Sequence, residues 1–246
     1  MANIFITGSA DGLGQLAAQQ LINEGHQVVL HARNKERGAE ALKHVPGAEA
    51  VLTGDLSNIE ETRKLADDVN ASGRFDSIIH NAAVYRAPGE EILNVNTLAP
   101  YMLTCLIQKP KRLIYLSSGM HLTGDPDLKK LENRRVTYSD SKLHVVILTM
   151  AVARMWTDVY VNAIDPGWVP TKMGGRGAPD NLVKGYQTQV WLATSNDKRA
   201  TASGQYFFHQ RARYFVEQAK DEKCQNEFLA ICERFTGVRF PSQHIK

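Results

Sequence analysis

Cysteine is scarce in this chain, with three residues among 246. Cys105, Cys224 and Cys232 are odd in number and lack the short paired spacing of metal ligands. We therefore expect neither a disulfide framework nor a bound metal. Reduced thiols in a cytoplasmic protein are the simplest interpretation of so few cysteines.

Long apolar runs and a strong charge of one sign are also missing. No run approaches the roughly 18–20 residues that span a bilayer, and residues 3–7 already have the pattern of a strand, which leaves no room for a signal sequence. The 29 basic and 26 acidic residues give a net charge of +3, too small to indicate nucleic acid binding. Two basic patches, 109–112 and 210–213, are best explained as solvated surface. We expect a cytoplasmic protein that binds neither nucleic acid nor membrane.

Short apolar runs rich in β-branched residues alternate with segments of helical period. This order is typical of parallel strands joined by helical crossovers, and right-handed crossovers give a doubly wound, mostly parallel α/β sheet. The length fits a single domain over residues 1–246. Such sheets bind ligands beyond the carboxyl ends of their strands. The predicted strands are 3–7, 27–31, 48–52, 77–80, 112–116, 159–164 and 205–208, and the predicted helices are 13–24, 35–44, 58–70, 90–107, 137–156, 181–194 and 214–235.

Two connections, residues 119–136 and 167–180, are long and rich in glycine, proline and charge. Each follows a predicted strand, so each begins at the edge of the sheet where ligands bind. Long connections in a compact domain commonly have a function. We therefore expect both segments to lie over an active site.

A glycine-rich turn, TGSADGLG (7–14), joins the first predicted strand to the first predicted helix. Gly8, Gly12 and Gly14 permit a tight turn and a close approach of the backbone to a pyrophosphate, whose charge the helix start favours. An ordinary strand-to-helix turn is the alternative. Because the motif has the required strand before it and helix after it, the turn predicts dinucleotide binding.

The end of the second predicted strand indicates which dinucleotide is bound. A site for NAD places an acidic side chain there, against the ribose hydroxyls. This chain has His31, Ala32 and Arg33 instead, and the guanidinium of Arg33 can pair with a 2′-phosphate. A surface arginine at a strand end is the alternative reading, and Asp11 in the glycine turn adds an opposing negative charge. The pattern favours NADP over NAD.

Tyr138 and Lys142 stand four residues apart at the start of a predicted apolar helix, in the segment YSDSK. This spacing places both side chains on one helix face. A neighbouring ammonium favours the phenolate and is expected to lower the tyrosine pKa, which makes the phenol a usable acid or base. A surface pair on a helix is the alternative, because the spacing alone is common.

Seven segments, in order along nearly the whole chain, resemble the motifs of the short-chain dehydrogenase/reductase family. The resemblance implies a Rossmann-like single domain, an NAD(P) cofactor and oxidoreduction of an alcohol or a carbonyl. Relatives commonly pair through their long helices, so a homodimer or homotetramer is expected. The segments are TGSADGLG (7–14), GDLS (54–57), HNAAV (80–84), NVNTLAP with Asn96, LSSG (116–119), YSDSK (138–142) and DPGWVPT (165–171).

The resemblance also implies roles for single residues. Tyr138 would be the acid/base, Lys142 would lower its pKa and hold the nicotinamide ribose, and Asn96 would fix a water in a proton relay through its backbone. Ser118 would hydrogen-bond the substrate oxygen, with Ser117 as the alternative serine. Asn96 has an alternative too, as a helix-interior residue bonded to a neighbouring strand. The implied cofactor-binding residues are Gly8, Ser9, Asp11, Gly12, Leu13, Arg33, Asp55, Leu56, Asn81, Ala82, Ala83, Tyr138, Lys142, Pro166, Gly167, Val169 and Thr171.

The sequence departs from the family pattern in two places. Ser118 and Tyr138 are 20 residues apart, which is long for the family and is similar to the retinol-dehydrogenase-like and carbonyl-reductase-like branches. Ala83 replaces the usual final glycine of the segment after the fourth strand. A loop must therefore fold away while the serine and tyrosine hydroxyls converge.

The substrate is expected to be a small or medium hydrophobic ketone or aldehyde. Met120, Trp168, Met173 and Tyr85 can form an apolar wall, whereas Arg86, Lys172 and Arg176 can meet an anionic group. Two other classes were weighed: a dinucleotide-binding regulatory or redox-sensor protein without turnover, and a sugar-nucleotide epimerase or dehydratase. The intact Ser118, Tyr138, Lys142 and Asn96 argue against the first, and the short chain argues against the second.

Overall fold

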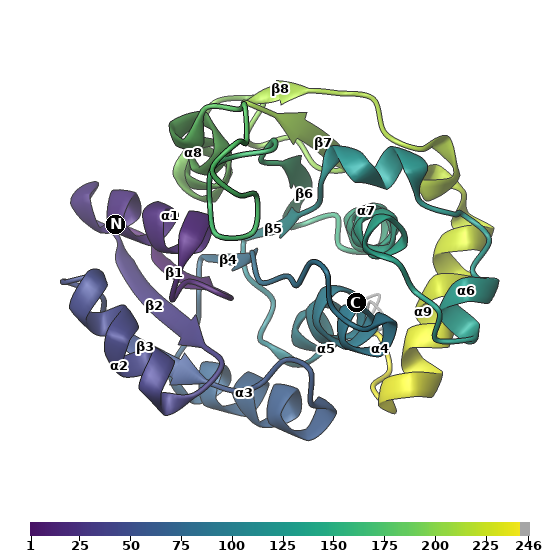
Figure 1. The fold of residues 1–246 in the computed structure, drawn as a ribbon, viewed down its shortest axis with the longest axis horizontal. Coiled ribbons are helices and arrows are strands. Elements are labelled where there is room, and N and C mark those ends of the chain that lie inside the picture. The colour runs from purple at the N-terminus through teal and green to yellow at the C-terminus, as the bar shows by residue number, and fades with distance from the viewer. Residues whose placement is uncertain (242–246) are drawn as a thin grey trace.

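A computed structural model describes residues 1–241 and arranges them around one eight-stranded sheet (Figure 1). The strand order is β3-β2-β1-β4-β5-β6-β7-β8, with β7 and β8 antiparallel and the other neighbours parallel. The order reverses beside β1, which is the arrangement of a doubly wound sheet and confirms the predicted fold class. The strands are β1 (Asn3–Ile6), β2 (Gln27–Ala32), β3 (Ala50–Thr53), β4 (Ser77–His80), β5 (Arg112–Leu116), β6 (Tyr160–Asp165), β7 (Gln205–Phe208) and β8 (Arg211–Ala212).

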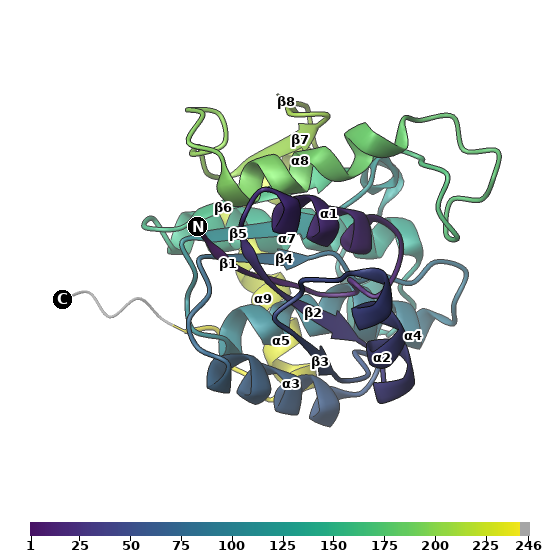
Figure 2. The same cartoon turned by 90° about the vertical axis from the view of Figure 1, so that its left-hand side faces the viewer.

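Helices cover both faces of this sheet (Figure 2). One layer contains α1, α2 and α8, and the other contains α3, α4, α5 and α7, with α9 packed against α7. Side chains along a strand alternate between the layers: Ile4 and Ile6 face the first layer and Phe5 faces the second. The helices are α1 (Gly12–Asn23), α2 (Lys35–His44), α3 (Ile59–Ala71), α4 (Gly89–Leu93), α5 (Ala99–Leu106), α6 (Lys129–Glu132), α7 (Tyr138–Met155), α8 (Leu182–Thr194) and α9 (Glu222–Thr236).

Helix α7 begins at the tyrosine of the YSDSK motif because of its cap. The Thr137 hydroxyl accepts a hydrogen bond from the Asp140 amide, and the Asp140 carboxylate accepts one from the Thr137 amide at 2.9 Å. This reciprocal capping box satisfies amides that the first helical turn leaves unpaired. Behind it α7 is apolar and almost wholly buried, so the cap fixes Tyr138 at one end of a rigid central helix.

Two predicted helices are interrupted in the structure. The predicted helix 90–107 consists of α4, a π-helical turn (Asn94–Leu98) and α5, and the predicted helix 214–235 begins only at Glu222. Asp221 starts that last helix, because its carboxylate accepts hydrogen bonds from the amides of Lys223 and Cys224. A short 3-10 helix (Glu217–Lys220) precedes it.

The predicted loop 119–136 also contains structure: a 3-10 helix (Gly119–Thr123) and α6. Strand β8 was not predicted. Among the described residues, no helix combines the length and the apolar character needed to cross a bilayer.

Candidate active site

A cleft of about 360 Å³ opens at the carboxyl ends of the central parallel strands. It runs from the end of β2 past the glycine turn to the amino end of α7, which is the edge where a doubly wound sheet binds its ligands. The segment after β6 covers part of it. Of the predicted cofactor-binding residues, those whose atoms line the cleft are Gly8, Asp11, Gly12, Leu13, Arg33, Asp55, Leu56, Asn81, Ala82, Ala83, Tyr138, Lys142, Pro166 and Thr171.

The glycine turn is packed so closely that it requires glycine. Gly8 has φ +63°, and a Cβ there would lie 2.8 Å from the Ala82 Cα atom. A Cβ on Gly14 would lie 2.4 Å from Asn81 Nδ2, which donates hydrogen bonds to the carbonyls of Thr7 and Gly8. The start of α1 is therefore pressed against the strand ends. Its Gly12 amide donates to the Asp11 carboxylate at 2.8 Å, and the next amides of this first turn have no partner within the helix.

His31 holds this turn through hydrogen bonds of its ring, a role that the sequence did not predict. Its Nδ1 accepts a hydrogen bond from the Gly8 amide at 2.9 Å, and its Nε2 lies 3.0 Å from the Gly54 carbonyl oxygen. Burial lowers the pKa of His31 to about 4, so the ring is neutral at pH 7 and can accept at Nδ1. A histidine at the end of a second strand is the only sequence signal for it.

The end of β2 carries an unopposed arginine. Arg33 is exposed and lines the cleft, and it forms no ion pair with any residue in the described range 1–241. The nearby acid Asp11 is already engaged, since its carboxylate bonds Lys172 at 2.5 Å and Arg37 at 3.3 Å. The negative charge expected to oppose a 2′-phosphate is thus paired with two cations.

Three predicted cofactor residues do not line the cleft. The Ser9 hydroxyl is buried, donates to the Ile6 carbonyl and accepts from the His31 amide. The Gly167 amide donates to the Asp165 carboxylate. Val169 is buried, and its carbonyl accepts from the Thr171 amide. All three residues form hydrogen bonds within the protein close to the cleft. Their direct contact with a cofactor stays a prediction.

Tyr138 and Lys142 lie on one face of α7, as their spacing predicts. Lys142 is 2% exposed, and its Nζ donates a hydrogen bond of 2.8 Å to the Leu116 carbonyl. The same Nζ lies 5.4 Å from the centre of the Tyr138 ring. Both side chains line the cleft, so a phenol and a buried ammonium meet one ligand together.

The pKa of Tyr138 differs from the expectation. Burial, with a smaller contribution from the charges of Asp165 and Tyr85, raises it to about 12, and the Ser118 hydroxyl has an opposing effect. Burial also lowers the pKa of Lys142 to about 8. In this arrangement the ammonium is held by Leu116 and does not acidify the phenol. Tyr138 is therefore a protonated donor at pH 7.

The two candidate serines have different surroundings, and of the two only Ser117 lines the cleft. The Ser117 hydroxyl is buried and donates to the Lys142 carbonyl at 2.8 Å. Ser118 is only half-buried, begins the 3-10 helix Gly119–Thr123, and interacts with the Tyr138 hydroxyl. Ser117 thus anchors α7, and Ser118 is the serine beside the phenol.

Asn96 lies inside the π-helical turn between α4 and α5. Its side chain is buried, accepts from the Val84 amide at 2.8 Å and donates to the Val84 carbonyl and the Ser141 hydroxyl, each at 3.0 Å. π-helical turns are frequent at functional sites. The side chain clamps the segment after β4 to α7, which matches the alternative reading, and a water relay through the backbone stays a prediction.

Asp165 is a second residue that the sequence analysis missed. It ends β6, and one carboxylate oxygen accepts from the Gly167 amide at 2.9 Å. The other would lie 3.0 Å from a Cβ on Gly119, beside the serine loop. Its charge raises the pKa of both Tyr138 and Lys142. The signal was an acid directly before the proline–glycine pair.

We expect Asp165→Asn to shift the pH profile of alcohol oxidation toward lower pH. Loss of the negative charge favours the Tyr138 phenolate, the form that accepts the alcohol proton. Oxidation at pH 7 should rise severalfold, while asparagine keeps an oxygen for the Gly167 amide. Initial rates between pH 6 and 10 would measure this, and an unchanged profile would show that Asp165 has no electrostatic role.

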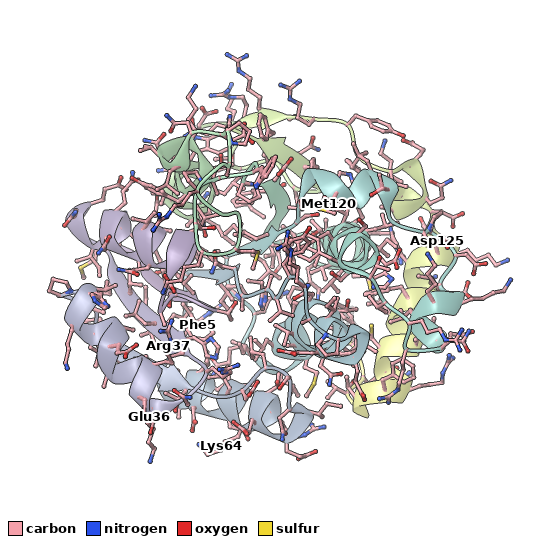
Figure 3. All side chains as sticks on the ribbon, viewed as in Figure 1. Phe5, Glu36, Arg37, Lys64, Met120 and Asp125 are labelled. Carbon is pink, nitrogen blue, oxygen red and sulfur yellow. The ribbon has the colours of Figure 1, made fainter. Side chains whose placement is uncertain are left out.

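The four side chains of the predicted apolar wall are all exposed. Trp168 is 60% exposed, and Met173, Met120 and Tyr85 are each about two-fifths exposed. Figure 3 shows Met120 beside the amino end of α7. The Tyr85 ring packs edge-on against Tyr138 at 4.8 Å. Of the predicted apolar wall, Met173 lines the cleft and Tyr85 contacts Tyr138, and a common wall with Trp168 and Met120 stays a prediction.

Comparison with known proteins agrees with this geometry. The short chain dehydrogenase family profile matches residues 2–181. The chain is 44% identical to an uncharacterized oxidoreductase of Emericella nidulans (98% of this chain, 99% of the relative) and 27% identical to human retinol dehydrogenase 14 (96% and 86%). A Shigella flexneri short-chain dehydrogenase solved with NADP is 21% identical, with a TM-score of 0.67 over 85% of this chain and 97% of that one. The chain belongs to the short-chain dehydrogenase family of oxidoreductases.

Proposed function

We propose that this oxidoreductase uses NADP(H) to interconvert a hydrophobic ketone or aldehyde and its alcohol. One observation carries the proposal: a single cleft joins the half-buried Tyr138 and the buried Lys142 at one end to the unpaired Arg33 at the other. The glycine turn between them fits a pyrophosphate, because it brings backbone amides to the cleft wall. The residues present therefore fit a dinucleotide in the orientation that the family uses.

Arg33 supports NADP over NAD. A guanidinium at the end of β2 offers paired donors to a 2′-phosphate, whereas no acidic side chain stands at that strand end to hold ribose hydroxyls. Asp11 does not cancel this preference, because Lys172 and Arg37 neutralise it. The Shigella flexneri relative binds NADP in its crystal structure.

The residues at the tyrosine end of the cleft have separate roles in the reaction. The bound nicotinamide supplies the hydride. Ser118 holds the substrate carbonyl oxygen as a donor, and Tyr138 gives its hydroxyl proton to that oxygen as the carbon is reduced. With the cofactor bound, Lys142 would hold the nicotinamide ribose, with its Nζ 5.4 Å from the centre of the Tyr138 ring. In the reverse direction the phenolate takes the proton from the alcohol.

The protonated state of Tyr138 favours reduction near neutral pH. With its pKa raised to about 12, almost all of the phenol carries the proton that reduction needs. At pH values below that pKa, each increase of one pH unit raises the phenolate fraction about tenfold. Alcohol oxidation is therefore faster under alkaline conditions. The apolar rim around Tyr85, Met120 and Trp168 fits a hydrophobic substrate.

A panel of aromatic and aliphatic ketones and aldehydes, followed by NADPH absorbance, tests the proposal. We expect turnover of apolar members, faster with NADPH than with NADH, and little turnover of carboxylate-bearing members. Cofactor titration by calorimetry is the control for a folded site. Tight NADPH binding without turnover of any carbonyl or alcohol would instead favour a regulatory dinucleotide-binding protein.

A further inference from the structure

A second pocket, of about 430 Å³, lies between α8 and the hairpin of β7 and β8. It shares no lining residue with the catalytic cleft in the described part of the chain. Phe208, at its wall, pairs with Asp165 in the sheet, so the pocket stands at the same carboxyl edge, one strand further out. Figure 1 shows the two elements together at the outer end of the sheet.

The lining of this pocket is strongly basic. Lys184, Arg199, Arg211 and Arg213 contribute to it, and among the residues 1–241 that line it there is no aspartate or glutamate. Arg199 is paired with Asp197 at 2.6 Å. The other three cations form no ion pair with a described residue. Three unneutralised positive charges therefore face one concave space.

The backbone explains why these charges converge. Lys184 and Thr188 are one turn apart on the same face of α8, and Arg211 and Arg213 are two residues apart on an extended segment, so each pair points one way. The Gln210 amide donates to the Thr188 hydroxyl at 3.2 Å and ties the hairpin to the helix. The Arg213 guanidinium lies 5.8 Å from the centre of the Phe208 ring, which orients it.

A polar atom inside the pocket wall also lacks a partner. His209 Nε2 is buried and forms no hydrogen bond with a described residue. His209 and Gln210 have φ +48° and +62°, a left-handed turn that normally prefers asparagine and glycine. Such backbone strain tends to persist at functional sites. The acids whose charges act on His209 are Asp180 and Asp165.

We propose that this pocket binds a polyvalent oxyanion, namely the phosphate or pyrophosphate group of a small molecule, at a site separate from the cofactor cleft. Arginine forks match the paired oxygens of a phosphate group, and the two arginines of the hairpin present such forks beside a lysine. Solvated surface, the initial reading of residues 210–213, does not explain a concave basic wall that lacks acids.

Calorimetric titration with inorganic pyrophosphate, at low salt and with saturating NADP⁺ present, tests this site. The variant carries Arg211→Gln and Arg213→Gln. The matched control carries Lys223→Gln and Arg239→Gln, which removes the same charge from exposed positions at and after α9. We expect the hairpin variant to weaken binding at least about tenfold for each arginine, because each loses a charge-assisted bond. The control should bind like the wild type.

Three results would overturn the proposal: no pyrophosphate binding to the wild type, equal weakening in both variants, or unchanged binding in the hairpin variant. Equal weakening would indicate general electrostatic attraction. Unchanged binding would place the anion elsewhere, including the cofactor cleft. Circular dichroism of both variants verifies that neither is unfolded. None of these outcomes depends on the catalytic assay, so they are separable from failure of the proposed activity.

Discussion

Replacing Tyr138 with phenylalanine is expected to lower turnover by about a thousandfold while leaving cofactor affinity within about twofold, because proton transfer by a positioned side chain contributes roughly 10²–10⁴ to the rate. The change removes one oxygen and keeps the ring. The ring contacts with Tyr85 at 4.8 Å and with the Lys142 ammonium at 5.4 Å therefore remain. The loss should fall mainly on kcat, since the proton moves only in the chemical step.

Stopped-flow hydride transfer with NADPH and a reducible ketone measures the effect, and calorimetry measures the cofactor. Tyr160→Phe is a matched control, because Tyr160 begins β6 at the opposite edge of the sheet and its hydroxyl is remote from the cleft. It should turn over like the wild type. Wild-type rates in the Tyr138 variant would show that another group supplies the proton.

A second readout separates loss of the proton from distortion of the site. The pH profile of any residual activity should lose the dependence on Tyr138 ionisation, since phenylalanine does not titrate. A merely distorted site would keep that dependence at a reduced rate. Lys142, whose burial lowers its pKa to about 8, remains as the nearest titrating group.

Local patterns predicted most of the fold. The strand at 77–80 coincides with β4, and the predicted helix 137–156 differs from α7 by one residue at each end. Both segments are strongly apolar, so the hydrophobic pattern of each one is enough to identify it. The start of α7 also depends on a neighbouring residue, the cap Thr137. The order of these segments then restricted the topology to one doubly wound sheet.

The interruption of the predicted helix 90–107 could not be predicted from local patterns, because contacts between residues distant in sequence cause it. Asn96 sits in a π-helical turn whose side chain bonds Val84 and Ser141, and no short window of sequence contains those three residues. The break before α9 is different. Asp221 is a residue type that commonly caps helices, so the sequence contained a signal for this start. The helical spacing of apolar residues on both sides of Asp221 led to the prediction of one continuous helix.

Most of the predicted cofactor-binding residues line one cleft, whereas the electrostatics of the site differ from the prediction. Motif order identified Ser118, Tyr138 and Lys142, because their relative positions are fixed by the fold. The direction of the tyrosine pKa depended on burial and on the charges of Asp165 and Tyr85, and both of these residues lie outside α7. The spacing of two residues predicts that they share a helix face. It does not predict how deeply that face is buried, and burial has the largest effect on the tyrosine pKa.

The second large effect concerns cofactor choice: Arg33→Asp should weaken NADPH binding by about a hundredfold and make NADH the preferred donor. The substitution removes a charge-assisted bond to the 2′-phosphate and places a carboxylate against it, and these two losses together reach a few kcal/mol. For NADH, the new carboxylate is expected to accept hydrogen bonds from the ribose hydroxyls. Ratios of kcat/KM for the two donors measure the change.

Lys35→Asp controls for the general effect of the charge change. Lys35 begins α2, is exposed two residues from Arg33, and does not line the cleft. It should leave the donor ratio near that of the wild type. If Arg33→Asp also left it there, the 2′-phosphate would have to be held by another cation. Arg37 is then the candidate, since its guanidinium is within 3.3 Å of Asp11 and half-exposed beside the same turn. We expect Arg33 to govern the choice, because it alone of these two arginines is free of a competing carboxylate in the described chain.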